Sequence, residues 1–419
     1  MDSVTQIVLG AAVGEVTLGH KAGNRAMLWG GVAGTIPDLD VLANFVTDEM
    51  TALAFHRGLT HSFFFAIVAP FIFAALVHPI YKNGLYQRRA YRRIGALWWG
   101  AVALVFMGLF NFVPVMAQGK ISFTMLTITL VLLALLIWLL WRNYYDSEPE
   151  PVKAGYWGWV SLFFWSTVTH PMLDACTAFG TQLFQPFSDY RVAFNTISVA
   201  DPLYTLPFLI CLIWASRLMR NSRKRKIINW LGIGISSAYL LFGLYHKLTF
   251  DNLVEKTLDE RQIEYNRFTT NPVILNNFLW NVVVDADTAY YHSIFSFNDR
   301  PRAIGDFRIF PKNHHLVDPY QGERSLEILK WFANDYYRIM PLPDGNLQFN
   351  DMRYGTFGAN GDVEDPSQYI FKFVLEEKNG VLEAYQPVDE GARDMGAAFG
   401  ELWEGIRGRQ INAQGGFRE

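Results

Sequence analysis

The sequence predicts an all-α polytopic membrane domain followed by a soluble α+β domain. Hydrophobic residues make up 51% of the 419 residues, and the mean hydropathy of +0.11 is high for a soluble protein. Residues 1–250 carry 19 Lys and Arg against 12 Asp and Glu, a net charge of +7, whereas residues 251–419 carry 17 against 27, a net charge of −10. This reversal indicates a domain boundary near residue 250.

Eight hydrophobic segments precede that boundary. A helix needs about 20 apolar residues to cross the hydrocarbon core of a bilayer. Six segments approach this length: residues 62–80, 94–116, 121–141, 154–173, 201–219 and 227–245. The other two, residues 3–19 and 25–36, are shorter and rich in glycine and alanine, which let helices approach closely. We therefore expect about eight hydrophobic helices, the first two forming a close-packed hairpin that either spans the bilayer fully or enters it only in part.

Basic residues predict the orientation of these helices, since short cytoplasmic loops are enriched in Lys and Arg. Residues 81–93 carry five basic side chains and residues 217–226 carry six. Both loops should be cytoplasmic, in a protein of the inner membrane. Residues 37–61, residues 174–200 and everything after residue 250 then face outward.

The segment after residue 250 predicts a soluble domain of mixed structure. Residues 282–297 have strand character, and residues 369–375 and 380–385 flank a hairpin signal. Residues 325–339 and 390–406 have helical periodicity. The acidic balance excludes nucleic acid as a partner, because binding it requires a basic surface.

Three motifs containing His and Asp lie at the predicted outward ends of the membrane helices. The first is Pro37-Asp38-Leu39-Asp40. Two carboxylates at positions i and i+2 of a turn can both reach one cation. The alternative interpretation is a Pro-Asp turn in which Asp caps a helix.

The second motif is His56-Arg57-Gly58-Leu59-Thr60-His61-Ser62. Two imidazoles five residues apart around a glycine can turn toward a shared ion, and neutral imidazole is a common metal ligand. Arg57 could hold an anionic substrate, because guanidinium pairs with phosphate in a forked geometry. The alternative is two interfacial histidines with an arginine whose charged head reaches water.

The third motif is His170-Pro171-Met172-Leu173-Asp174. His170 and Asp174 are four residues apart and so share one helical face, a spacing used by helical metal sites. The alternative is a His and an Asp that pair with each other at the membrane interface.

Together the motifs predict a metal-dependent hydrolase site. The expected ligands are Asp38, Asp40, His56, His61, His170 and Asp174. This mixed nitrogen and oxygen set suits zinc, which we favour, with manganese or iron as alternatives. One or two ions both fit the set, and two would suit phosphodiester hydrolysis. Arg57 would position an anionic phosphoester or lipid-derived substrate, and Asp40 or Glu15 would act as the general base.

Glu15 has two further interpretations, because it lies within the first hydrophobic segment. A charged group in an apolar helix is costly and therefore needs a partner or a function. It could be a metal ligand, or a structural acid that forms hydrogen bonds between helices.

Residues 1–250 resemble the YdjM-type family of membrane-bound metal-dependent hydrolases. The resemblance rests on the three motifs and on residues 1–6, 10–15, 28–30, 179–182 and 201–204. It implies a metal-dependent hydrolase, and the family is distantly similar to zinc-dependent phospholipase C and P1-type nucleases, which use a His-x-x-x-Asp pair on a helix. Many members carry Thr-His where this chain has Thr5-Gln6. Because glutamine is a poor zinc ligand, the resemblance implies one ligand fewer at that position.

A second class of function fits the same residues. The His and Asp cluster could hold a structural metal in a non-catalytic membrane protein whose acidic tail docks a partner. A vacant coordination position would favour the enzyme, and a closed shell would favour this alternative.

Overall fold

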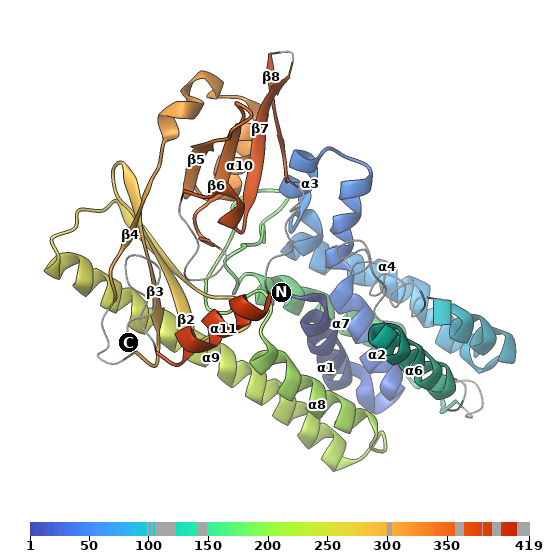
Figure 1. Cartoon of the computed structure of the whole chain (residues 1–419). Helices are drawn as coiled ribbons and strands as arrows, with labels where there is room; N and C mark the ends of the chain where they lie inside the picture. The colour runs from blue at the N-terminus through green and yellow to red at the C-terminus, as the bar shows by residue number, and fades with distance from the viewer. Residues whose placement is uncertain are drawn as a thin grey trace.

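The computed structural model of the chain describes residues 1–98, 100–101, 104, 123–140, 142, 149–299, 304–356, 364–378, 380–387 and 395–408. A helical N-terminal region is followed by a C-terminal domain of two antiparallel sheets. Figure 1 shows the helices gathered on one side of the molecule and the sheets on the other, with the long helix α9 extending from the helices along the first sheet.

The first two helices form the close-packed hairpin that the sequence predicts. Helix α1 (Ser3–Ala22) and helix α2 (Asn24–Thr35) are joined at Gly23. A Cβ atom on Gly10 would lie 2.3 Å from the Gly30 carbonyl oxygen, and one on Gly14 would lie 2.2 Å from that of Ala26. No larger side chain fits at these distances, so glycine is what allows the two backbones to touch.

Further helices of the described helical region are α4 (Phe63–Lys82), α6 (Phe123–Leu140), α7 (Tyr156–Asp174), α8 (Pro202–Ser216) and α9 (Arg223–Glu260). Helix α7 packs against α1, α2 and α4, and its Trp159 and Phe163 lie in the main helical core. Helices α4 and α8 expose large apolar side chains such as Ile72 and Ile210. Exposed apolar surface of this extent is typical of contact with lipid.

The expected number of eight membrane helices is not confirmed. Among the described residues, two helices are long and apolar enough to cross a membrane, Phe63–Lys82 and Arg223–Glu260. Helix α8 has 15 residues, which is short of a span, and most of the predicted segment 94–116 lies outside the described residues. The helical class of the N-terminal region is confirmed.

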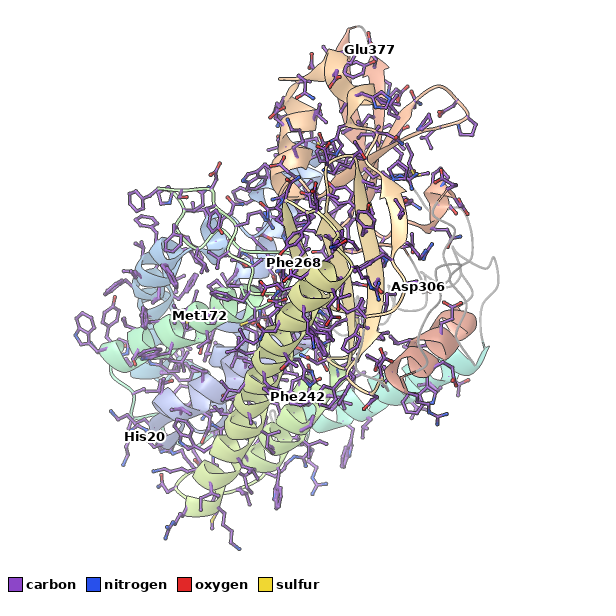
Figure 2. The ribbon with its side chains drawn as sticks, turned by 90° about the vertical axis from the view of Figure 1, so that its left-hand side faces the viewer. His20, Met172, Phe242, Phe268, Asp306 and Glu377 are labelled. Carbon is purple, nitrogen blue, oxygen red and sulfur yellow. The ribbon has the colours of Figure 1, made fainter. Side chains whose placement is uncertain are left out.

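Basic side chains gather at one end of the helical region. Arg220 forms an ion pair with Glu150 and donates to the Pro151 carbonyl, and Arg25 donates to the Glu150 carbonyl. His20, in the last turn of α1, lies in Figure 2 at the end of the molecule away from the sheets. The opposite end carries the 3-10 helix η1 (Pro37–Phe45), helix α3 (Glu49–Phe55) and the 3-10 helix η2 (Leu59–His61).

The described C-terminal domain contains two four-stranded antiparallel meanders. The first sheet has the order β1 (Arg267–Pro272), β2 (Leu279–Asp285), β3 (Ala289–Ser296) and β4 (Arg308–Pro311). The second has the order β5 (Tyr337–Pro341), β6 (Leu347–Asp351), β7 (Lys372–Lys378) and β8 (Val381–Tyr385). The remaining short elements are η3 (Leu85–Gln87), η5 (His314–Tyr320), α10 (Arg324–Phe332), η6 (Pro366–Gln368) and α11 (Met395–Ile406).

Two of the predicted elements of this domain are different in the structure. Residues 282–297 form the hairpin β2–β3 rather than one strand. The helix predicted over residues 325–339 ends at Phe332, because Asn334 and Asp335 both have positive φ angles, and β5 follows. The hairpin predicted around Gly380 is confirmed as β7–β8.

The two parts of the chain are not independent in space. Helix α9 continues through residue 250 to Glu260, and its Phe250 and Val254 pack in the core beneath the first sheet. Met50 of α3 is 3% exposed and packs in the core of the second sheet and α10. The connection that carries two of the predicted motifs is therefore fixed to the C-terminal domain.

Candidate metal centre

Three segments far apart in the sequence bring four donor atoms together. Asp38 comes from η1, His61 from η2, and His170 and Asp174 from the last turn of α7. One donor atom from each side chain lies within 4.8 Å of all the others. The sequence motifs share this site because the ends of α2, α4 and α7 meet at the same end of the helical region.

Five of the six distances between the donors are close to those around a tetrahedral ion, and the sixth, between Asp38 and Asp174, is within 4.8 Å. The Nε2 atoms of His61 and His170 are 3.1 Å apart. Asp38 Oδ1 lies 3.4 Å from each of these nitrogens, and Asp174 Oδ2 also lies 3.4 Å from each. Metal–ligand bonds of about 2.0–2.1 Å in a tetrahedral site require donor separations of about 3.3–3.4 Å.

Hydrogen bonds turn both imidazole lone pairs toward this centre. His170 Nδ1 lies 2.5 Å from the Gly34 carbonyl oxygen, which can only accept, so Nδ1 carries the proton and Nε2 the lone pair. His61 Nδ1 lies 3.2 Å from both Asp40 Oδ2 and Thr60 Oγ1. Because the carboxylate can only accept, it holds a proton on Nδ1, which makes Nε2 the atom that would bind an ion. A carboxylate or carbonyl behind each ligand histidine is the usual arrangement at metal sites.

Asp40 supports the centre rather than joining its four donors. Its Oδ2 accepts hydrogen bonds from the Arg57 backbone N–H at 2.8 Å and from His61, and its Oδ1 lies 2.8 Å from His56 Nδ1. Its carboxyl group is buried, and burial raises its pKa, but the hydrogen bonds from His56 and His61 outweigh burial and hold that pKa below its usual range. Asp40 therefore fixes both histidines of the second motif.

The electrostatics of the centre favour positive charge. Burial disfavours a charged His61, but its contacts with Asp174 and two further carboxylates outweigh burial and raise the pKa of His61 to about 10. Asp174 Oδ2 is buried, 3.3 Å from Arg57 Nε and 3.4 Å from the Nε2 atoms of His61 and His170. None of these contacts has good hydrogen-bond geometry. Because a buried carboxylate without well-formed hydrogen bonds is costly, a cation between the four donors would stabilise it and take the place of the second proton on His61.

Arg57 is buried beside the centre. Its φ angle of 56° is left-handed, and the adjacent Gly58 has no room for a Cβ, which would lie 2.7 Å from the Phe55 carbonyl oxygen. This turn aims the guanidinium at Asp174 Oδ2, 3.3 Å from Nε, and at Thr177 Oγ1, 2.9 Å from Nη1. Arg57 thus brings a positive charge to the edge of the four donors.

The structure does not bring two of the predicted residues into the donor set. His56 pairs with Asp40, and its side chain is 28% exposed. Glu15 forms a buried two-pronged ion pair with Arg225, at 2.6 and 2.5 Å. Nine residues of α1 separate Glu15 from Gln6, about 13 Å along a helix axis, so Glu15 takes no part in the centre.

Gln6 lies directly behind Asp174. Its Nε2 donates to Asp174 Oδ1 at 2.9 Å and to the His170 carbonyl oxygen at 3.3 Å. It therefore orients a donor residue of the centre.

Residues that the motifs do not include also hold the site. Arg191 donates to the carbonyl oxygens of Phe179 and Gly180, and its guanidinium and that of Arg57 lie 4.9 and 4.6 Å from the Phe179 ring centroid. It is the one basic residue between residues 174 and 200, which is the signal that could have identified it. Phe332 of α10 packs on the same ring, and no sequence pattern links it to this face.

The fold and the donor set define a helical membrane protein with a buried Asp/His/His/Asp cluster at one end. The chain belongs to the YdjM inner membrane protein family, whose sequence model matches residues 1–113 and 122–250. No curated protein and no solved structure gives a significant match. The matched region contains all four donors, while the two sheets lie beyond it.

Proposed function

We propose that the chain is a membrane-bound metal-dependent hydrolase that acts on phosphoesters at the outer face of the inner membrane. The observation that carries the proposal is the set of four donor atoms within 4.8 Å of one another, five of whose six separations measure 3.1–3.4 Å. Asp38, His61, His170 and Asp174 would hold the ion, with zinc favoured by the donor types and spacing. When bound, the ion would activate water and polarise the ester.

His56 is the proposed general base. Because Asp40 can only accept a hydrogen bond, His56 Nδ1 carries the proton and Nε2 is left to accept one from water. A histidine held this way by a carboxylate is a common arrangement for proton transfer, worth about 10²–10⁴-fold in rate. Its partly exposed ring, beside the buried His61, supports contact with both solvent and substrate.

The charge of the site supports an anionic substrate. Asp174 pairs with the buried Met1 amino group and lies 3.3 Å from Arg57 Nε. With a divalent cation among the donors, the positive groups would therefore outweigh the carboxylates of the site. A phosphodiester carries one negative charge and would complement this positive site, and the Arg57 guanidinium would orient it.

The outward orientation rests on the distribution of charge. The basic loops lie at the end of the helical region opposite the metal centre, where Arg25, Arg220 and Arg225 make their contacts. Cytoplasmic loops are enriched in such residues, so the centre and the C-terminal domain would face outward.

The test combines metal content with turnover of bis(4-nitrophenyl) phosphate by the full-length protein in detergent. The His61→Ala and His170→Ala variants should lose the metal. The His56→Gln variant should keep it and lose activity by about 10²–10⁴-fold. The His20→Gln variant, at an exposed position away from the centre, is the matched control and should retain both. Unchanged metal content in His61→Ala would show that the ligand set is incorrect.

A second candidate function is a structural metal site in a non-catalytic protein. Four protein donors are typical of closed structural sites, whereas catalytic zinc usually has three and keeps a position for water. Asp38 is the donor with an 18% exposed side chain, so water would have to enter on its side. Bound metal without hydrolysis of a broad ester and phosphoester panel would favour the structural function.

A further inference from the structure

An apolar groove borders the metal centre along η1. It has a volume of 440 Å³, within the range of small-molecule sites. Its lining comprises Leu39, Asp40, Leu42, Ala43, Val46, Thr47, Thr51 and Phe55. Asp40 is the one charged residue of this lining, and it is the carboxylate that holds His56 and His61. The groove therefore lies next to the metal centre, because Asp40 lines the groove and its buried carboxylate contacts His61.

The surface around the groove is unusually apolar for a loop. Phe45 and Val46 are 83% and 82% exposed, which is costly in water. The 3-10 helix η2 contacts both η1 and the start of α4, one of the helices able to cross a membrane. If α4 enters the bilayer beside η2, the neighbouring groove would lie near the level of lipid head groups and the first chain carbons.

The polar side chains of the groove already have hydrogen-bond partners within the protein. The Thr47 hydroxyl donates to the Ala43 carbonyl at 2.9 Å, and the Thr51 hydroxyl bonds to Asp48 at 2.5 Å. Both oxygens of Asp40 are already bonded. A peptide segment would need partners for its N–H and C=O groups, whereas a hydrocarbon chain needs none.

We propose that this groove binds the hydrocarbon chain of a membrane phospholipid while its phosphodiester lies at the metal centre. The proposal rests on the proposed function and narrows its substrate to an anionic amphiphile. The chain would bury Leu42, Val46 and Phe55, and the negative phosphodiester would complement the net positive charge of the metal-loaded site. In the reaction, a water oxygen forms a bond to phosphorus, the ester P–O bond breaks, and the leaving alcohol takes up a proton.

A matched pair of substrates and a matched pair of variants test the groove. The substrates are 4-nitrophenyl methyl phosphate and 4-nitrophenyl dodecyl phosphate, which differ in the chain. Ala43→Trp fills the groove and should raise KM for the dodecyl ester at least tenfold while leaving the methyl ester unchanged. Asn44→Trp adds the same side chain at the neighbouring exposed position outside the lining and should change neither. An equal effect of Ala43→Trp on both esters would overturn the proposal.

A binding measurement separates this proposal from the proposed function. Dodecyl phosphate with a diazirine at the chain end is photolysed with the full-length wild-type protein in bicelles, and the adducts are mapped by mass spectrometry. Adducts at Leu42, Val46 or Phe55 support the groove even if no ester is hydrolysed, in which case the proposed function alone fails. Adducts confined to the outer face of α4 would overturn the lipid site. Cross-links between the groove and a second copy of this chain would overturn it as well.

Discussion

Replacing Asp40 with asparagine removes one charge and one acceptor from the carboxylate behind His61. The Oδ2 atom of Asp40 accepts from the Arg57 N–H at 2.8 Å and lies 3.2 Å from His61 Nδ1, while Oδ1 faces His56. The NH₂ group of the asparagine amide can only donate, and therefore cannot replace the oxygen that accepts from the Arg57 N–H. We expect it to face His56, because the partly exposed ring of His56 can change tautomer and present a nitrogen that accepts. The remaining oxygen keeps His61 oriented with a weaker, neutral acceptor.

The expected loss follows from this geometry. Loss of a partner behind a ligand histidine lowers metal affinity by about 10–100-fold, equivalent to about 1.4–2.7 kcal/mol. We expect Asp40→Asn at the lower end of this range and Asp40→Ala at the upper end. His56 in Asp40→Asn would hold its proton on Nε2 and no longer accept one, so turnover should fall further than metal affinity.

Competition with a fluorescent zinc chelator measures the affinity for the purified full-length protein. Asp189→Asn is the matched control, because Asp189 is exposed in the loop on the same face, and it should bind as the wild type does. The reasoning is refuted if Asp40→Asn and Asp40→Ala both bind zinc with wild-type affinity, since Asp40 would then not orient His61.

Three further predictions concern packing, pH and orientation. Gly30→Ala should lower the free energy of unfolding by about 1–3 kcal/mol or more, because its Cβ would lie 2.2 Å from the Gly10 carbonyl oxygen. Gly31→Ala is the control, since its Cβ would meet ordinary contacts at 3.4 Å. Equal melting temperatures of the two variants would contradict the close packing. Burial lowers the pKa of His292 to about 3. As the pH falls below about 6.5, the histidine therefore takes up a proton in the unfolded state but not in the folded state. The free energy of unfolding should then drop by about 1.4 kcal/mol between neutral pH and pH 5.5. Denaturant titration should show this drop in the wild type and its loss in His292→Leu. Alkaline phosphatase fused to the C-terminus should be active outside the cytoplasm, and an inactive fusion with a fluorescent cytoplasmic reporter would reverse the proposed orientation.

The hydropathy and glycine patterns were sufficient to predict the helical region and its first hairpin. The glycines and alanines of segments 3–19 and 25–36 predict close contact, because larger side chains would keep the two helix backbones apart. The same local signals misplaced elements in the C-terminal domain. The helix predicted over residues 325–339 stops at Phe332, where Asn334 and Asp335 adopt left-handed angles and the strand β5 begins. Such a change depends on packing against the second sheet rather than on periodicity.

The sequence by itself determined the chemistry available to this protein: three motifs that supply histidines and aspartates at helix ends, and a membrane-embedded region to carry them. Only the tertiary structure decided which of these side chains meet. His170 is 109 residues from His61 and 136 from the Gly34 carbonyl that orients it, and no local pattern encodes such contacts. Packing of α7 against the hairpin joins four donors and leaves Glu15 in an ion pair with Arg225. The same packing leaves Asp40 and His56 beside the donors. The Asp40 carboxylate accepts hydrogen bonds from the Arg57 N–H and from His56, and these hold it away from the four donors.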